Sequence, residues 1–337
     1  MQIERINAIT WVLAAIGFLA QLVIAATAHA QSSPINPILP KLTAASNKAS
    51  EISPNSNQAG ISSVVTIDPN LIVLNAIHQA VWGPALACKV YQRSVAFDQQ
   101  VIISGDYKAS GLGTGQFRYS ARVSSGETTV DKIQVSDGRL MFTQVGIDEP
   151  PQRVNLDQIR QSLGNAIHHA GERPEVNFYL AVGGHPEMLR NLYHRYFWYK
   201  AVTRQIKGVD VWQLVGRLRT DSPKPAGNAP LDMQTLSAPQ AGSNLPTDVQ
   251  LTLGRSASAA YFPYMVEYYL RTKRVDGQPD TIDWLSILEH SELTTAVTIV
   301  DKDFVFKVQD SVDKIDDETS LYVPSIPLVD RQLFPPR

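Results

Sequence analysis

Alternating apolar and polar residues run through the middle of this 337-residue chain, and they constrain its fold more than any other feature. One run places four apolar residues at every second position: Phe117, Tyr119, Ala121 and Val123. A period of two puts these side chains on one face of a β-strand and the polar ones on the other. Asp137-Gly138 then joins two such runs with the dipeptide most typical of a tight hairpin. The pattern therefore predicts an antiparallel sheet with one dry face and one wet face.

Further strands follow from the same alternation later in the chain. They are predicted over residues 210–219, 249–254, 261–271, 294–300 and 304–308, with residues 301–303 as the turn of the last pair. Because many short strands follow one another with few helices between them, a parallel βαβ sheet is not expected.

Three other segments have the apolar spacing of amphipathic helices. The first has Asp68 as its N-cap and Pro69 at its first position, the second starts at Asn155, and the third follows Gly183-Gly184. Their predicted apolar stripes are Leu71, Leu74, His78 and Val81; Leu156, Ile159, Leu163 and Ile167; and Leu189, Leu192, Tyr193 and Tyr196. The sequence thus predicts an α+β fold, in which about three helices cover the concave face of a curved antiparallel sheet. Helices that seal this face would give an ordinary core, and helices that cover it loosely would leave a ligand cavity.

Residues 1–30 have the pattern of a secretory signal peptide. After a short polar start no charge follows from Ala8 to Ala30, and the small residues Ala28 and Ala30 suit a signal peptidase. Cleavage there would release the rest of the chain into the periplasm or cell envelope. The alternative is an uncleaved signal anchor in the inner membrane, because ~20 apolar residues are also enough to span a bilayer.

Composition divides the remainder of the chain. Residues 31–63 are rich in Ser, Asn, Pro and Ala and lack aromatic residues, which predicts a disordered linker. Residues 64–310 hold the alternating segments and form the predicted domain, with a long loop at 221–244. The Pro-rich residues 311–337 form a predicted tail.

Charge and reactive side chains exclude several classes of function. A formal net charge of -2 lacks the basic excess of a nucleic-acid surface, so no nucleic-acid partner is expected. Cys88 is the only cysteine, which rules out an internal disulfide, and its apolar neighbours favour a buried thiol. The adjacent His168 and His169 do not form a metal motif, and no nucleophile motif occurs. We therefore expect no enzyme activity, no cofactor and no bound metal.

Six segments occur in an order that characterises a known family. They are SGDYKASGLGTGQFRYS (104–120), RVNLDQIRQSL (153–163), GGHPEMLRNLYHRYFW (183–198), GVDVWQLVGRLR (208–219), LPTDVQLTLG (245–254) and YFPYMVEYY (261–269). In this order the chain resembles the LolA-like superfamily of periplasmic, outer-membrane lipoprotein-sorting carriers and related exported proteins. Within it, the chain is most similar to an exported branch of planctomycete-type bacteria. The resemblance extends over residues 68–308, most of the predicted domain.

The resemblance implies an incomplete β-barrel of about eleven strands, with the helices as a lid in its concave side. It also implies a cavity for the acyl chains of a lipoprotein or another lipid. In such carriers a basic residue of the sheet tethers the lid, and Arg93, Arg118 and Arg122 are the candidates here.

Two functions are compatible with these features. The first is a monomeric half-barrel carrier of lipid, acyl chains or another apolar ligand, with five candidate cavity-lining residues: Phe117, Tyr119, Phe142, Leu189 and Tyr193. The second is an envelope interaction or scaffold module, with a filled core, a protein partner and no ligand. A cavity beneath the helices would distinguish the carrier from the module.

Overall fold

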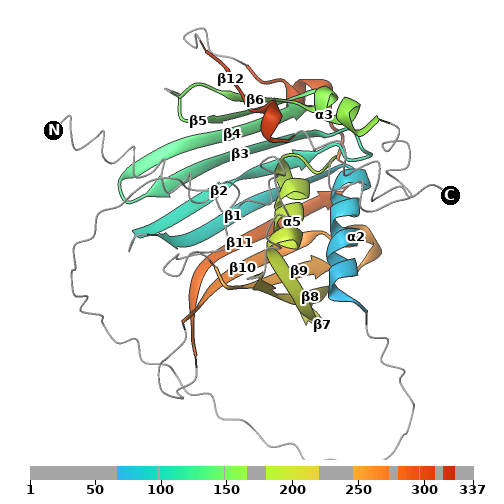
Figure 1. The fold of residues 1–337 in the computed structure, drawn as a ribbon, viewed down its shortest axis with the longest axis vertical. Coiled ribbons are helices and arrows are strands. Elements are labelled where there is room, and N and C mark those ends of the chain that lie inside the picture. Colours follow the sequence, from blue (N-terminus) through green and yellow to red (C-terminus); the bar gives the residue numbers. More distant parts are fainter. Residues whose placement is uncertain are drawn as a thin grey trace, which may run out of the picture. The chain divides into compact units, whose positions relative to one another are not determined.

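Figure 1 shows the computed structural model of the chain. It describes residues 67–96, 99–147, 149–164, 180–219, 246–272, 280–295, 297–307 and 314–322. The predicted signal peptide, linker and long loop lie outside these residues, and so does most of the predicted tail. Ile167, His168 and His169 lie outside them as well. In the part that is described, no helix combines the length and the apolar character needed to cross a membrane.

Twelve strands of the described residues form one sheet. In chain order they are β1 (Leu86–Ala96), β2 (Gln99–Ala109), β3 (Gln116–Ser125), β4 (Thr128–Asp137), β5 (Leu140–Val145), β6 (Gln152–Asn155), β7 (Tyr196–Ile206), β8 (Val209–Leu218), β9 (Asp248–Gly254), β10 (Pro263–Thr272), β11 (Thr281–Thr295) and β12 (Asp316–Asp317). The helices are α2 (Pro69–Trp82), α3 (Leu156–Leu163) and α5 (Gly184–Arg195), and the short 3-10 turns are η3 (Ala257–Ala259), η4 (Asp301–Phe304) and η5 (Thr319–Leu321).

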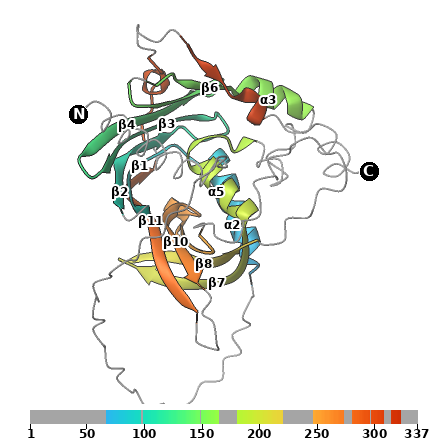
Figure 2. The ribbon, with the colours of Figure 1, turned by 60° about the vertical axis from the view of Figure 1, so that its left-hand side comes forward.

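The sheet consists of two hairpin meanders that meet at one pair of strands. Its order is β12-β6-β5-β4-β3-β2-β1-β11-β10-β9-β8-β7, and only β12 and β6 are parallel neighbours. The antiparallel pair of β1 and β11 joins the meander β1–β6 to the meander β7–β11. The sheet is open, with β12 and β7 as its edges, and it curves around α2 and α5 (Figure 2). The predicted α+β fold with a curved sheet and about three helices is confirmed.

The central strand β11 was missed by the sequence analysis. Of its 15 residues only Ser286 and His290 are buried, and both are polar. The apolar alternation that marks a half-buried strand is therefore absent from this segment. The strand β7 was missed for another reason, because its first residue, Tyr196, continues the apolar stripe of α5.

The two strands predicted near the C-terminus are wrong. β11 ends at Thr295, and residues 301–304 form η4 instead of a hairpin turn. Asp303 Oδ2 accepts a hydrogen bond from the Val300 N–H at 3.3 Å, which closes a single helical turn. This turn lies against β3 and β4, where Phe304 is buried.

Helix α2 begins as predicted, but it buries a different stripe. Asp68 Oδ1 accepts a hydrogen bond from the Asn70 N–H at 2.9 Å, with Pro69 in the first turn. The buried residues are Ile72, Val73, Ala76 and Ile77. Leu71 of the predicted stripe is 47% exposed. Apolar residues occupy most positions of this helix, so their spacing did not distinguish the face that packs against α5 and β7.

We expect Asp68→Ala to lower the free energy of unfolding by about 1 kcal/mol, because the Asn70 N–H loses its acceptor. Urea unfolding measures the change. The matched control is Asp283→Ala on β11, whose side chain is exposed and caps no helix. Equal losses in both variants would contradict the capping role.

In the other two helices, the described residues of the predicted stripes are buried, except Tyr193, which is partly buried. Asn155 Oδ1 caps α3 by accepting a hydrogen bond from the Gln158 N–H at 3.0 Å. The buried residues of α3 are Leu156, Ile159 and Leu163, and α5 buries Leu189 and Leu192. Tyr196, the last residue of the predicted stripe of α5, is buried as the first residue of β7.

The strand register separates a face covered by α2 and α5, here called the helix face, from an outer face. Phe117 pairs with Ser136, which pairs with Met141 of β5, and all three are buried on the helix face. The hairpin between β4 and β5 turns at Asp137-Gly138 as predicted, with Gly138 at a φ of 90° that favours glycine. One apolar cluster packs α2 and α5 against β7–β10, and a second packs α3 and Val182, which precedes α5, against β1–β3 and β5.

Candidate functional site

The helix face holds four of the five residues predicted to line a ligand cavity. Phe117 is 3% exposed, and its ring stacks on Tyr107 with 6.1 Å between the centroids. Leu189 of α5 is fully buried above the sheet. Tyr119 and Tyr193 are partly buried against the clusters beneath the helices. The structure thus gathers these four residues on one side of the sheet.

Phe142, the fifth residue, lies on the outer face. The register pairs it with Val135, one position away from the inward pair of Ser136 and Met141. Its ring stacks on Phe306, which follows η4, with 4.8 Å between the centroids. The hairpin register therefore directs Met141 toward the helices, and Leu140 and Phe142 point toward the outer face.

A small cavity lies beneath the helices. The cavity there has a volume of about 40 Å³ and lies among the C-terminal turns of α2, strands β2 and β3, and the start of α5. Pockets that bind small ligands have volumes of roughly 300–1,000 Å³. This cavity is therefore too small for a ligand of that size.

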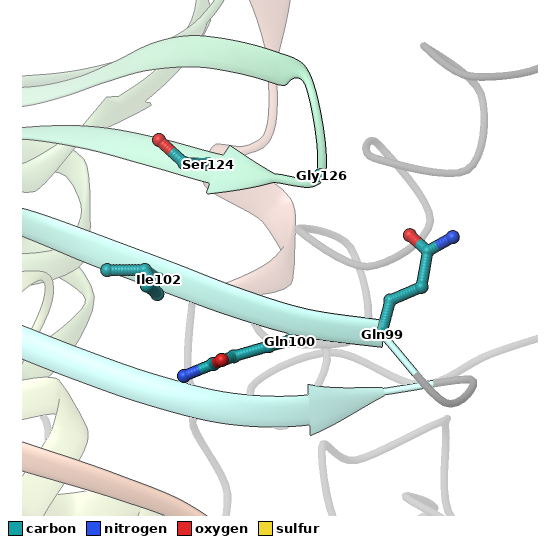
Figure 3. Close-up of a pocket in the computed structure, with 5 residues that line it drawn as sticks. All are labelled: Gln99, Gln100, Ile102, Ser124 and Gly126. Atoms are coloured by element: carbon teal, nitrogen blue, oxygen red, sulfur yellow. The ribbon is translucent and has the colours of Figure 1, made fainter.

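A larger hollow opens elsewhere, at the ends of β2 and β3 (Figure 3). Its volume is about 430 Å³, and its lining residues are Gln99, Gln100, Ile102, Ser124 and Gly126. Ile102 is the only large apolar side chain among them. An acyl chain would remain largely exposed to water in such a hollow, so it is a poor site for an apolar ligand.

Two buried histidines join α5 to the middle of the sheet. His185 lies at the start of α5 and His290 on β11, with exposed fractions of 6% and 5%. Their Nε2 atoms are 3.0 Å apart. The Tyr107 ring of β2 stacks on His185 with 3.8 Å between the centroids, and His290 Nδ1 donates to the carbonyl oxygen of Pro263 on β10. The first turn of α5 is thereby connected to three strands.

This chain of hydrogen bonds determines the proton positions of the pair. A backbone carbonyl only accepts, so His290 carries its proton on Nδ1 and accepts at Nε2 from the His185 Nε2–H. Burial lowers the pKa of His290 to about 4. Burial, and then the neighbouring His290, lower the pKa of His185 well below its ordinary value. Both rings are neutral near pH 7, and two protonated rings at this distance would repel each other.

Helix α5 also carries a buried ion pair. Glu187 Oε1 lies 3.4 Å from Arg190 Nη2, with side-chain exposed fractions of 9% and 7%. Glu187 Oε2 accepts a hydrogen bond from the Gly183 N–H at 2.7 Å, which closes the first turn of the helix. Burial lowers the pKa of Lys132 on β4, and the nearby Glu187 carboxylate opposes this shift. The side of α5 that faces the sheet is therefore polar as well as apolar.

The three arginines predicted as candidate lid tethers all lie on the outer face. Arg93 stacks over the ring of Trp284 at 4.7 Å from its centroid. Arg118 donates to Ser120 Oγ at 3.2 Å, and Arg122 pairs with Asp131 at 3.3 Å. These contacts do not involve the helices, whereas His290 of β11 and Gln134 of β4 both hydrogen-bond to residues of α5.

Cys88 is buried on the helix face, as predicted. Burial, and then the charge of Asp106, raise the pKa of its thiol to about 12, so the reactive thiolate is not formed near neutral pH. The described residues contain no group of three or more His, Cys, Asp or Glu side chains placed to hold a metal ion.

Sequence reasoning missed the polar residues of this site. His185 is not part of the predicted apolar stripe of α5, and Glu187 and Arg190 have the spacing of an ordinary surface ion pair. His290 lies on the strand that was not predicted. Only the pairing of β11 with β1 and β10 brings these side chains together.

These features define an α+β protein that encloses an aromatic and imidazole-rich layer between two helices and an open sheet. No family model and no curated protein matches the chain. Among solved structures, the LolA superfamily protein NE2245 from Nitrosomonas europaea is similar, with 14% identity over 72% of this chain and 99% of that chain and a TM-score of 0.27. A domain described as an outer membrane lipoprotein-sorting protein from Vibrio parahaemolyticus is also similar, with 9% identity over 69% of this chain and 95% of that chain and a TM-score of 0.26.

A third similar structure is the MucA/MucB complex of Pseudomonas aeruginosa, with 11% identity over 71% of this chain and 61% of that chain and a TM-score of 0.31. The descriptions of the first two structures name the superfamily, or the lipoprotein-sorting class, that the sequence resembles. The similarity to a branch of planctomycete-type bacteria stays a prediction.

Proposed function

We propose that this chain is an exported protein of the periplasm or cell envelope that binds the acyl chains of a lipid or lipoprotein between α5 and the sheet. The observation that carries the proposal is the layer of rings beneath α5. Tyr107, Phe117 and Phe262 surround the histidine pair, with 5.8 Å between the centroids of His185 and Phe262. Side chains of this size can turn aside and line an apolar ligand.

Binding requires α5 to move, because the existing cavity of about 40 Å³ is too small for an acyl chain. Gly183 and Gly184 precede and open the helix with φ values of 74° and 54°. A Cβ at Gly184 would lie 2.7 Å from the Tyr107 hydroxyl. Two consecutive glycines at positive φ are a suitable pivot, since glycine changes conformation without steric strain.

The driving force for such a movement is the burial of the ligand itself. Each methylene removed from water contributes ~0.8 kcal/mol, so a chain of about sixteen carbons supplies on the order of 12 kcal/mol. This energy can offset the loss of the His185–His290 contact and of part of the apolar packing. Short or polar ligands would leave the helices closed.

A charge on the helix face is expected to abolish this binding. Wild-type protein should bind a fluorescent fatty acid saturably, and Tyr119→Glu should weaken that binding at least about tenfold, because a carboxylate in an apolar site must be desolvated. The matched control is Ser120→Glu, one residue along β3 on the outer face, which should change the affinity by less than about twofold. Fluorescence titration measures both.

The alternative is an interaction module with a filled core, which the small cavity volume favours. Mass spectrometry of lipid extracted from the purified protein separates the two functions. Absence of bound lipid, together with no saturable fatty-acid binding, would contradict the carrier proposal and leave the module.

A further inference from the structure

The edge strand β7 is less buried than its neighbour β8. Among the described residues it pairs only with β8, and Figures 1 and 2 show it as the last strand of the sheet. Asn70 of α2 donates to the carbonyl oxygen of Trp198 at 3.3 Å, so the helix covers the first part of this edge. From Tyr199 to Ile206 no residue is buried. This second part of β7 is therefore a long strand without a buried face.

The exposed part of β7 is basic. Lys200, Arg204 and the following Lys207 are exposed, and residues 196–206 contain no acidic residue. None of these three cations has an ion-pair partner among the described residues. Four other cations of the described residues do have acidic partners: Lys89 with Asp106, Arg122 with Asp131, Arg139 with Asp157 and Arg153 with Asp317. This edge thus presents three exposed cations within eight residues, in a chain whose net charge is -2.

Exposed rings accompany these charges. Only three aromatic side chains of the described residues are counted as exposed, and two of them, Phe197 at 54% and Tyr199 at 46%, are on β7. The Arg217 guanidinium of β8 lies 5.7 Å from the centroid of the Tyr199 ring. A β-bulge between Trp198 and Lys200 places Tyr199 beside the basic stretch.

We propose that residues 199–206 of β7 bind an extended, acidic segment of another protein, which adds to the sheet as a further strand. An unpaired edge offers backbone donors and acceptors to such a segment. Glutamate or aspartate at alternate positions would meet Lys200 and Arg204, and an apolar residue would contact Phe197 and Tyr199. The proposal is independent of lipid binding, because β7 lies at the edge and the rings beneath α5 lie inside.

Lysines and bulges also occur on edge strands that pair with nothing, where they prevent aggregation. The distinguishing property is affinity for an acidic strand. The probe is a fluorescent peptide of about ten residues with alternating glutamate and valine, and fluorescence anisotropy measures its dissociation constant. A second probe keeps this sequence but carries N-methyl groups on alternate backbone amides, which removes the donors of one edge without changing the charge.

Saturable binding of the first peptide, with at least about tenfold weaker binding of the N-methylated one, would support strand addition. Lys200→Glu/Arg204→Glu should also weaken binding at least about tenfold. The matched control is Lys302→Glu/Lys307→Glu, which makes the same change in net charge at exposed residues of segment 297–307 and should have little effect.

Three outcomes would overturn the proposal. They are equal binding of the N-methylated peptide, equal binding of a lysine–valine peptide, and binding of phosphatidylglycerol vesicles without binding of the acidic peptide. The last result would assign the basic edge to a membrane surface.

Discussion

Arg190→Met is expected to lower the free energy of unfolding by about 3–5 kcal/mol, because it leaves the Glu187 carboxylate buried without its cation. The carboxylate keeps its hydrogen bond from the Gly183 N–H, but apolar contacts of the new side chain do not replace the lost ion pair. Equilibrium unfolding in urea measures the loss. The double variant Glu187→Met/Arg190→Met should be more stable than the single Arg190 variant, because it removes both charges together.

The control for this prediction is Arg139→Met. Arg139 also pairs with an aspartate, Asp157, at 2.9 Å, but its side chain is 80% exposed. Exposed pairs contribute about 0–1 kcal/mol, so this variant should remain close to wild type. If both single variants lost the same stability, the burial of the Glu187–Arg190 pair would not matter to the fold.

The second large effect is a loss of stability in acid. The pKa of His290 falls from its ordinary 6.5 to about 4 in the folded protein. Between these values the unfolded chain binds a proton that the folded protein does not bind, so stability falls as the pH decreases from about 6.5 to about 4. His290 alone lowers the free energy of unfolding by about 3 kcal/mol over this pH interval. His185, whose pKa is also lowered, changes stability in the same direction.

The double variant His185→Phe/His290→Leu isolates the contribution of the pair. Its stability at neutral pH is not the readout, because the substitution also removes the hydrogen bond to Pro263. The readout is the slope of the unfolding free energy against pH, which should be shallower than in wild type between about pH 6.5 and pH 4. Identical slopes would show that these histidines do not carry the acid response.

Local signals in the sequence predicted those elements whose structure depends on neighbours along the chain. The Asp137-Gly138 hairpin, the Asp68 cap of α2 and the buried stripe of α3 all formed as expected. In contrast, the sequence of β11 does not show the apolar alternation of a half-buried strand, because its inward residues are the polar Ser286 and His290. Its pairing with β1 and β10 is what makes it a central strand. Polar side chains can face inward there because each finds a partner on another element: Ser286 with Ser94, and His290 with His185.

The candidate site could be predicted only in its apolar part. Phe117, Tyr119, Leu189 and Tyr193 follow the strand and helix periods, and they lie where those periods place them. Phe142 was misplaced because the parity of β5 depends on the hairpin register, which a short turn can shift by one residue. The burial of Glu187 depends on residues far along the chain, since the side chain of Tyr322 hydrogen-bonds to it.

The pairing of β1 with β11, which joins the two meanders, also determines the order in which the sheet forms during synthesis. Gln92 Nε2 donates to Ser286 Oγ across it at 3.2 Å, although the two residues are 194 positions apart. A chain that emerges with its N-terminus first completes the meander β1–β6 long before residues 281–295 exist. Contacts over such separations form slowly, and β1 remains an unprotected edge until then. A polypeptide that stops short of β11 would hold two half-sheets with no strand to join them.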